Sequence, residues 1–422
     1  MTYEFQYLME TLGFVAKGLP ILPPKQDIDW ERFFQLSKEQ VLEPLVFHGL
    51  KESGLPYPKE LIAKQMQSTE LTIVGCCAKR LWILDLLNKL EQAGIRVVVV
   101  KGFIAAANYA KPECRISSDT DIWIDPADEE RACEFFASYG FDVTPRWNNG
   151  HHAIAKHKRN REVVEIHVQL YDEIVEEVWF GKEDASELVQ EPFQKIVIPE
   201  GSCYTLGNTD NLIFMALHMV KHFILSGMSL RMMMDVALFF QKYKDSIDTE
   251  RFWSTLRGFK YDRLLTVILW AMIHHCGFVP EDFPGIGPDD PEQVDMVLND
   301  LEAGGWLGKN NRQARTASFD EYNRRLLMKD KNKIQYFFFI LNWQHSFKLS
   351  TLFPGKKRLA RHYPYVLKYP VLIPFAWIHR IIFRGLRLLK PKALTKKMVL
   401  DSDKINSESK KRIDMFQSLD ML

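Results

Sequence analysis

Two aspartates, Asp119 and Asp121, stand two residues apart at the start of an apolar, β-like run. Because side chains alternate along a strand, both carboxylates are expected on the same face. Paired carboxylates offer the hard oxygen ligands that suit Mg²⁺ on the phosphates of a nucleotide. The run 96–100, almost entirely β-branched, ends at Lys101-Gly102, where a residue without a Cβ lets the backbone approach a ligand. This layout is typical of a phosphate and metal site.

A further carboxylate and an imidazole share one face later in the chain. Residues 152–157 and 162–170 alternate like two strands that a polar turn joins. In the second of these strands Glu165 and His167 point the same way. If that strand neighbours the one with Asp119 and Asp121, Glu165 converges on the two aspartates.

In their order along the chain, these residues resemble the nucleotidyltransferase superfamily that has a catalytic fold of the DNA polymerase β type. Within it, the chain is most similar to a family of uncharacterised bacterial nucleotidyltransferases. The similarity covers most of the chain from about residue 70 onward. The motifs that carry it are Lys101-Gly102, Tyr109, Arg115, Asp119-Thr120-Asp121-Ile122, Glu165-Ile166-His167, His218, His222, Arg231-Met232-Met233-Met234-Asp235 and Leu352-Phe353-Pro354.

The resemblance implies transfer of a nucleoside monophosphate, expected to be AMP from ATP, with release of pyrophosphate. Metal ions neutralise the developing charge in related phosphoryl-transfer enzymes. By resemblance, the catalytic residues and ligands of Mg²⁺ or Mn²⁺ are Asp119, Asp121 and Glu165. His167 is expected to be an auxiliary donor or to orient Glu165. The acceptor stays open among a small molecule, a sugar, a protein side chain and an RNA end.

Lys101 and Arg115 are expected to contact the triphosphate, with Gly102 at the turn, because the planar arginine fork meets phosphate oxygens bidentately. The wider superfamily usually has Gly-Ser or Gly-Gly at this turn, whereas this chain has Gly102-Phe103. A serine hydroxyl is therefore missing at that position. The two serines that could supply one are Ser117 and Ser118.

The candidate residues also have structural interpretations. Aspartates are common in solvated turns at strand starts, and Glu165 could lie on an exposed strand face. His218 and His222 are four residues apart on a predicted helix, so with Asp235 they could chelate zinc. The alternative is a packed helix pair whose polar groups bond one another and line the cleft.

The expected fold class is α+β, with a mixed-sheet nucleotidyltransferase core between helical regions. The expected organisation is a helical region 1–70, the α/β core 71–206, a helical domain 207–350 and a basic, apolar segment 351–422. In the helical domain, the periodicity predicts helices over 211–225, 230–242, 250–256, 261–276 and 291–301. Residues 304–318 are expected to form a polar loop.

Composition is that of a soluble globular protein, with 46% hydrophobic and 26% charged residues. The six cysteines lack metal spacing, and the first ten residues lack the pattern of a signal peptide, so cytoplasmic placement is expected. The net charge of +1 hides an asymmetry. Residues 331–400 contain fifteen Lys and Arg but no acid, and the last 22 residues sum to −1, so the first 330 residues sum to −13.

The basic segment has three interpretations, of which nucleic-acid binding is the least favoured because no binding module is recognisable. Its predicted helix over 375–389 has Arg380, Arg384 and Arg387 on one face, which suits either docking on the acidic remainder or peripheral contact with an anionic inner membrane surface. The alternative to an enzyme is therefore a non-catalytic protein that keeps the fold and docks on a partner or membrane through its basic C-terminus.

Overall fold

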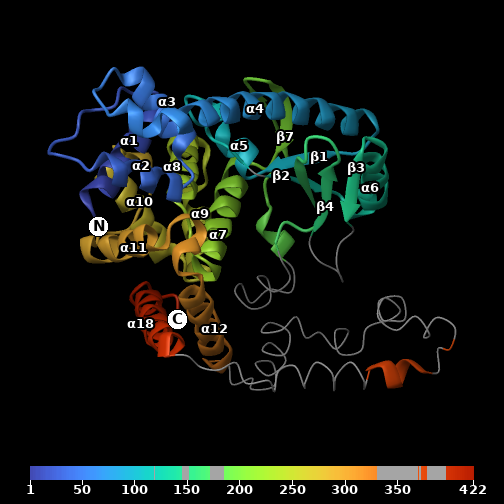
Figure 1. Ribbon diagram of the computed structural model, residues 1–422. Coiled ribbons are helices and arrows are strands. Elements are labelled where there is room, and N and C mark those ends of the chain that lie inside the picture. The colour runs from blue at the N-terminus through green and yellow to red at the C-terminus, as the bar shows by residue number, and fades with distance from the viewer. Residues whose placement is uncertain (118, 145–151, 172–184, 330–368, 370–371, 378–395) are drawn as a thin grey trace. The chain divides into compact units, whose positions relative to one another are not determined.

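The computed structural model describes residues 1–117, 119–144, 152–171, 185–329, 369, 372–377 and 396–422 (Figure 1). The chain forms two compact units, which are residues 1–319 with 412–421 and residues 320–411 with 422. The sheet and most of the described helices belong to the first unit. The second is described mainly at the end of one helix, α12 (Arg312–Lys329), and the beginning of another, α18 (Lys396–Ser418).

A mixed sheet of seven strands lies at the centre of the first unit, in the order β3-β4-β5-β2-β1-β7-β6. β2 runs parallel to β5 and antiparallel to β1, while β1 runs parallel to β7. The mixed sheet with flanking helices confirms the predicted fold class. The strands are β1 (Val97–Val100), β2 (Asp119–Ile124), β3 (Phe141–Thr144), β4 (His152–His157), β5 (Val163–His167), β6 (Gln194–Ile198) and β7 (Gly201–Thr205).

β1 shows why this sequence forms the core of the sheet. Its four residues are all valines and all buried, as expected for β-branched side chains in a central strand. The strand ends directly before Lys101, and the short helix α5 (Gly102–Ala106) follows. The strands predicted from the valine run and from the alternating patterns are therefore confirmed.

Helices from both ends of the chain pack together beside the sheet. α1 contacts α2, α3 and α10, and α7 contacts α8 and α9. The long helix α4 packs on β1 and β7, and α6 packs on β3 and β4 (Figure 1). Besides α5 and parts of α12 and α18, the helices of the first unit are α1 (Tyr3–Ala16), α2 (Trp30–Glu39), α3 (Glu43–Ser53), α4 (Lys59–Gln92), α6 (Glu129–Ser138), α7 (Asn208–Leu225), α8 (Leu230–Tyr243), α9 (Thr249–Gly258), α10 (Asp262–Cys276) and α11 (Pro291–Gly304).

The polar loop predicted over 304–318 is wrong. A 3-10 segment, η7 (Trp306–Asn311), is followed by α12, which begins at Arg312. The polar composition is misleading because Arg315 is buried, with Nη2 donating to the Asp300 carbonyl at 2.7 Å and Nε to the Asn311 side chain at 2.6 Å. A charged residue with such partners can occupy a core position of a helix.

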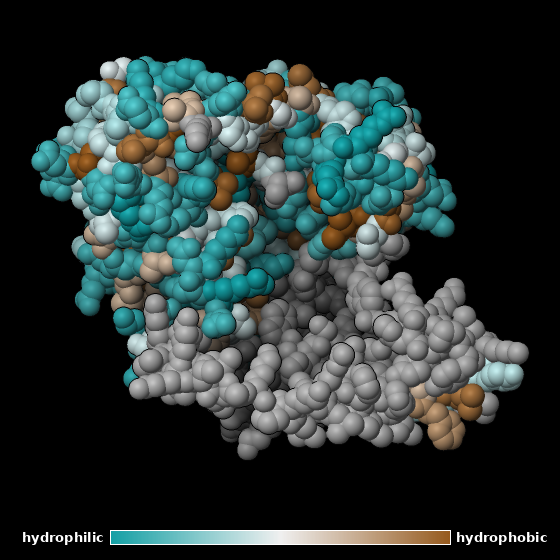
Figure 2. Space-filling model, in the orientation of Figure 1, coloured by the Kyte–Doolittle hydropathy of each residue, from teal (hydrophilic) through white to brown (hydrophobic). Residues whose placement is uncertain are grey.

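The C-terminal residues of α18 belong to the first unit. Arg412 is buried there, and it donates to the Asp300 carboxylate at 2.5 Å and to the Phe223 carbonyl at 2.6 Å. The predicted helix over 375–389 and the acid-free segment fall largely outside the described residues. Within the part of the chain that is described, no helix combines the length and apolarity needed to span a bilayer. The face of the first unit seen in Figure 2 is mostly hydrophilic, with scattered hydrophobic residues.

Candidate active site

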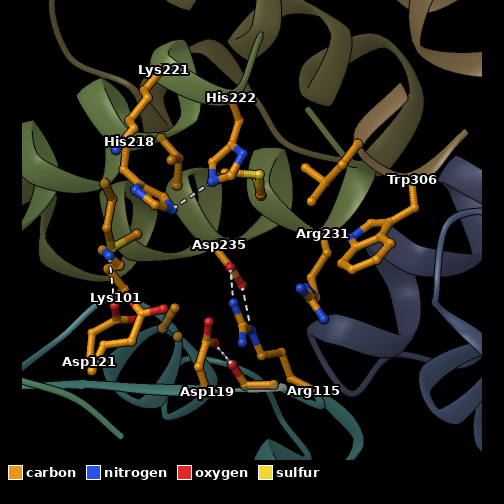
Figure 3. Close-up of a pocket in the computed structure, with 18 of the residues that line it drawn as sticks. Lys101, Arg115, Asp119, Asp121, His218, Lys221, His222, Arg231, Asp235 and Trp306 are labelled. Atoms are coloured by element: carbon orange, nitrogen blue, oxygen red, sulfur yellow. Dashed lines mark hydrogen bonds and ion pairs between the residues drawn. The ribbon is translucent and has the colours of Figure 1, made fainter. Parts of the chain in front are cut away.

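Parallel pairing of β2 with β5 brings the predicted carboxylates to one cavity. In this pairing Asp121 lies directly opposite Glu165, and Asp119 precedes Asp121 by two residues. All three line a cavity of about 390 Å³, as do Lys101 and Arg115. Figure 3 shows that this cavity lies between the sheet and helices α7 and α8. The sequence-predicted residues therefore converge, except that Ser118 lies outside the described residues.

The Asp121 carboxylate is buried and lies between two nitrogen donors. Its Oδ1 accepts from Lys101 Nζ at 2.7 Å and lies 3.0 Å from His167 Nε2. Burial by itself would raise the pKa of Asp121, but Lys101 and His167 outweigh burial and hold that pKa well below its usual range. Asp121 is therefore a carboxylate, which is the form that binds a cation.

Lys101 adopts an unusual backbone conformation, with φ 57° and ψ −126°. A positive φ is uncommon for a residue with a Cβ and costs on the order of 1–3 kcal/mol. The turn places the Lys101 ammonium beside Asp121 at the point where β1 ends. Such strain is characteristic of functional sites.

Glu165 lies beside two imidazoles. Its Oε2 is 3.4 Å from His167 Nε2, and the ligand atoms of Glu165, His167 and His152 all lie within 4.8 Å of one another. Burial lowers the pKa of His152, which favours the neutral, metal-binding form of its ring. In the described part of the chain no other three such side chains approach this closely, so His218, His222 and Asp235 do not form the metal site considered above.

Gly102 is needed for a close approach within the protein itself. A Cβ at this position would lie 2.7 Å from Arg115 Nη1 and 3.0 Å from Ser117 Oγ. Ser117 Oγ in turn donates to Asp119 Oδ1 at 3.3 Å. The side chain of Phe103 is buried, with the Arg80 guanidinium 4.6 Å from its ring centroid. Ser117 thus supplies a hydroxyl to the cavity, and Phe103 does not line it.

Arg115 forms a buried ion pair with Asp235 of α8. Its Nε donates to Oδ1 at 3.1 Å and its Nη2 to Oδ2 at 2.5 Å, while the Tyr109 hydroxyl donates to Oδ1 at 2.8 Å. Burial alone would lower the pKa of Arg115, but Asp235 more than offsets it and raises that pKa. This bidentate pair connects the loop before β2 to the helical wall.

The helical wall of the cavity carries a histidine pair on α7. The Nε2 atoms of His218 and His222 are 3.2 Å apart. Burial lowers the pKa of His222 to about 4 and holds that of His218 well below its usual value. Both rings are consequently neutral near pH 7, as in a packed helix pair that lines a cleft.

Several cavity-lining residues lie outside the predicted site, among them His152, Lys221, Arg231, Trp306 and Leu307. The sequence contains one indication that Arg231 lines the site: it precedes Asp235 by four residues, so the two share a helix face. It contains no such indication for Trp306 and Leu307, since they fall in the segment predicted to be a polar loop. The cavity is therefore more basic and more aromatic than the sequence motifs indicate.

The residues present fit a divalent cation. Asp119, Asp121 and Glu165 line one cavity with oxygen donors of the kind that Mg²⁺ and Mn²⁺ prefer, but their ligand atoms do not all lie within 4.8 Å of one another, so a cation would have to draw them together. The two imidazoles beside Glu165 add nitrogen donors, which suit Mn²⁺ better than Mg²⁺.

Comparison with known proteins gives one family match. A family model described as "Uncharacterised nucleotidyltransferase" matches residues 26–276, which include every cavity residue except Trp306 and Leu307. No curated protein matches significantly. One similar solved structure is the antibiotic-resistance factor ANT(2″)-Ia, with 11% identity and a TM-score of 0.30 over 49% of this chain and 98% of that chain. Another is an antigenic nucleotidyltransferase-like protein from Paracoccidioides brasiliensis, with 15% identity and a TM-score of 0.28 over 44% of this chain and 88% of that chain.

Proposed function

Because the chain belongs to the family described as uncharacterised nucleotidyltransferases, we propose that its cavity binds a nucleoside triphosphate and transfers the nucleoside monophosphate to an acceptor. ATP is the expected donor. The observation that carries this proposal is the register of β2 and β5, which places Asp121 opposite Glu165 with Asp119 two residues away. Lys101 already neutralises Asp121, and a bound cation would offset the charge of Asp119 and Glu165 in the same cavity.

In the proposed reaction, an acceptor oxygen attacks the α-phosphorus and the bond to the β-phosphate oxygen breaks, so that pyrophosphate leaves. Glu165 accepts the proton of the acceptor hydroxyl, because it faces the cavity beside the two aspartates. Asp119, Asp121 and Glu165 would hold a Mg²⁺ or Mn²⁺ ion, which would supply charge neutralisation on the phosphates. Lys101 keeps Asp121 ionised and oriented.

The absence of a serine after Gly102 is compatible with this activity. The Phe103 side chain is directed into the core, so it leaves the cavity open. Ser117 is the hydroxyl that lines the cavity, and its bond to Asp119 orients that carboxylate. We therefore assign to Ser117 the polar contact that a serine at the turn would make.

Calorimetric titration with ATP and Mg²⁺ tests the proposal. The wild type is expected to bind, and the double substitution Asp119→Ala with Asp121→Ala is expected to abolish binding. Asp142→Ala is the matched control, because Asp142 is an exposed aspartate on β3 of the same sheet. A wild type that binds no nucleotide would refute the proposal. Incubation with α-labelled nucleotides and cell extract then identifies the base and the acceptor.

The acid-free basic stretch 331–400 supports a second role at an anionic membrane surface. Fifteen basic residues without an acid favour anionic lipid headgroups, and this role does not require catalysis. Sedimentation with vesicles that contain anionic lipid is expected to capture the full chain. Charge reversal at Arg380, Arg384 and Arg387 should abolish capture, and the double aspartate substitution should not.

A further inference from the structure

The cavity contains four lysines and arginines, and two of them are committed to carboxylates. Lys101 pairs with Asp121, and Arg115 pairs with Asp235. Arg231 differs, because no carboxylate oxygen of the described residues lies within 4.0 Å of its guanidinium. Its Nη1 donates to the Ile116 carbonyl at 2.7 Å, and its buried Nε has no acceptor in the described part of the chain.

Arg231 also stands where a helix attracts anions. It is the second residue of α8, whose first turn contains no acidic residue and whose N-cap, Ser229, accepts from Met232 N. Helix N-termini carry partial positive charge, so a cation there is unfavourable unless an anion is present. Burial and the neighbouring Arg115 lower the pKa of Arg231 to about 10, while the nearby Asp235 and Asp119 oppose that shift. The guanidinium is therefore charged at neutral pH, and it has no carboxylate partner within 4.0 Å among the described residues.

The position of Arg231 relative to the carboxylates suits an extended anion. In Figure 3, Arg231 lies on one side of Asp119, while Lys101 and Asp121 lie on the other side. Its bond to Ile116 holds it against the loop that carries Ser117. An anion bound at the carboxylates through a metal ion could thus extend past Asp119 and Ser117 to reach the guanidinium.

We propose that Arg231 binds the polyphosphate tail of the nucleotide, the contact that the sequence predicts for Arg115. The proposal rests on the proposed nucleotidyl transfer and names a binding residue for it. Arg115 has its fork engaged by Asp235, so it positions the loop before β2. Arg231 has no direct ion pair among the described residues, and its unused Nε is a donor that a phosphate could accept from.

Calorimetric titrations with Mg²⁺-ATP, inorganic tripolyphosphate and adenosine test this assignment on the full chain. Arg231→Gln should weaken ATP and tripolyphosphate binding about tenfold to hundredfold, as expected for loss of a charged hydrogen bond. Adenosine binding should not change. Arg231→Lys keeps the charge without the fork and should give intermediate affinity. Arg257→Gln is the control, since it removes an exposed arginine of α9 outside the cavity.

Unchanged tripolyphosphate affinity in Arg231→Gln overturns the inference, as does an equal loss for adenosine. Suppose that the wild type binds ATP, that the double aspartate variant does not, and that Arg231→Gln binds ATP as the wild type does. Then only this inference fails, and the proposed function stands. If the wild type binds neither ATP nor tripolyphosphate, the proposed function fails with it. If Arg231→Gln does not fold, chemical modification of the wild-type arginines by a phenylglyoxal reagent tests the inference instead. Tripolyphosphate should protect the peptide that contains Arg231, and lack of protection contradicts the inference.

Discussion

At the scale of single residues, the ion pair with Lys101 keeps the buried Asp121 carboxylate ionised. The ammonium lies 2.7 Å from a buried carboxylate and is the largest influence that lowers the pKa of Asp121. We infer that the strained backbone at Lys101 is retained because it delivers this ammonium to Asp121.

We predict that, as the pH falls, the Lys101→Met variant loses nucleotide binding at a higher pH than the wild type does. Without the ammonium, burial raises the pKa of Asp121, so the carboxylate takes up a proton earlier as the pH falls. An opposite charge at this distance accounts for about 1–3 pH units. ATP binding with Mg²⁺, measured by calorimetry from pH 7 down to pH 3, should show its acid limb at a higher pH in Lys101→Met than in the wild type. Lys156→Met, an exposed lysine on β4, is the control, and an identical acid limb in both variants would contradict the prediction.

At the scale of elements, the Arg115–Asp235 ion pair connects the loop before β2 to helix α8. Arg115 precedes β2 and Asp235 lies on α8, 120 residues later, yet both are buried and bonded bidentately. The hydroxyl of Tyr109, which follows α5, donates to the same carboxylate. This arrangement holds the loop with Ser117 in place against α8.

We predict that Asp235→Asn destabilises the protein by about 3–5 kcal/mol, because it leaves the buried Arg115 charge without its counter-ion. Urea denaturation at neutral pH measures this loss. Asp85→Asn on α4 is the matched control: it breaks an exposed pair with Lys89 and should cost about 1 kcal/mol or less. Equal effects of the two substitutions would show that the buried pair does not stabilise the fold.

The strands of the site could be predicted from sequence because they depend on local pattern. Four consecutive valines predict β1, and alternation predicts β4 and β5. The partner of Arg115 could not be predicted, because 120 residues separate it from Asp235 and no local period connects them. Helix α12 was missed for a related reason, since buried Arg315 resembles a surface residue until Asp300 is found beside it.

At the scale of the whole molecule, the buried histidines of the cavity make the fold less stable at acidic pH. Its α7 wall keeps His222 neutral by burial, with a pKa of about 4 in the folded state and an ordinary value near 6.5 when unfolded. Between these two pH values the unfolded chain binds a proton that the folded chain does not. Folding stability must therefore fall as the pH drops from about 6.5 to 4. The loss from the low pKa of Asp121 comes later, below the ordinary carboxyl pKa of 3.8, so the two effects separate.

We predict that the free energy of unfolding decreases by about 1–3 kcal/mol between pH 7 and pH 4.5 through this histidine, with His218 adding to the effect in the same direction. Urea denaturation at several pH values measures the slope. His222→Gln should flatten it, because glutamine has no proton to gain. His48→Gln, a histidine on α3 outside the cavity, should reproduce the wild-type slope. If His222→Gln loses as much stability in acid as the wild type, then His222 does not account for the acid sensitivity, and the other histidines whose pKa burial lowers, His152, His218 and His275, must account for it instead.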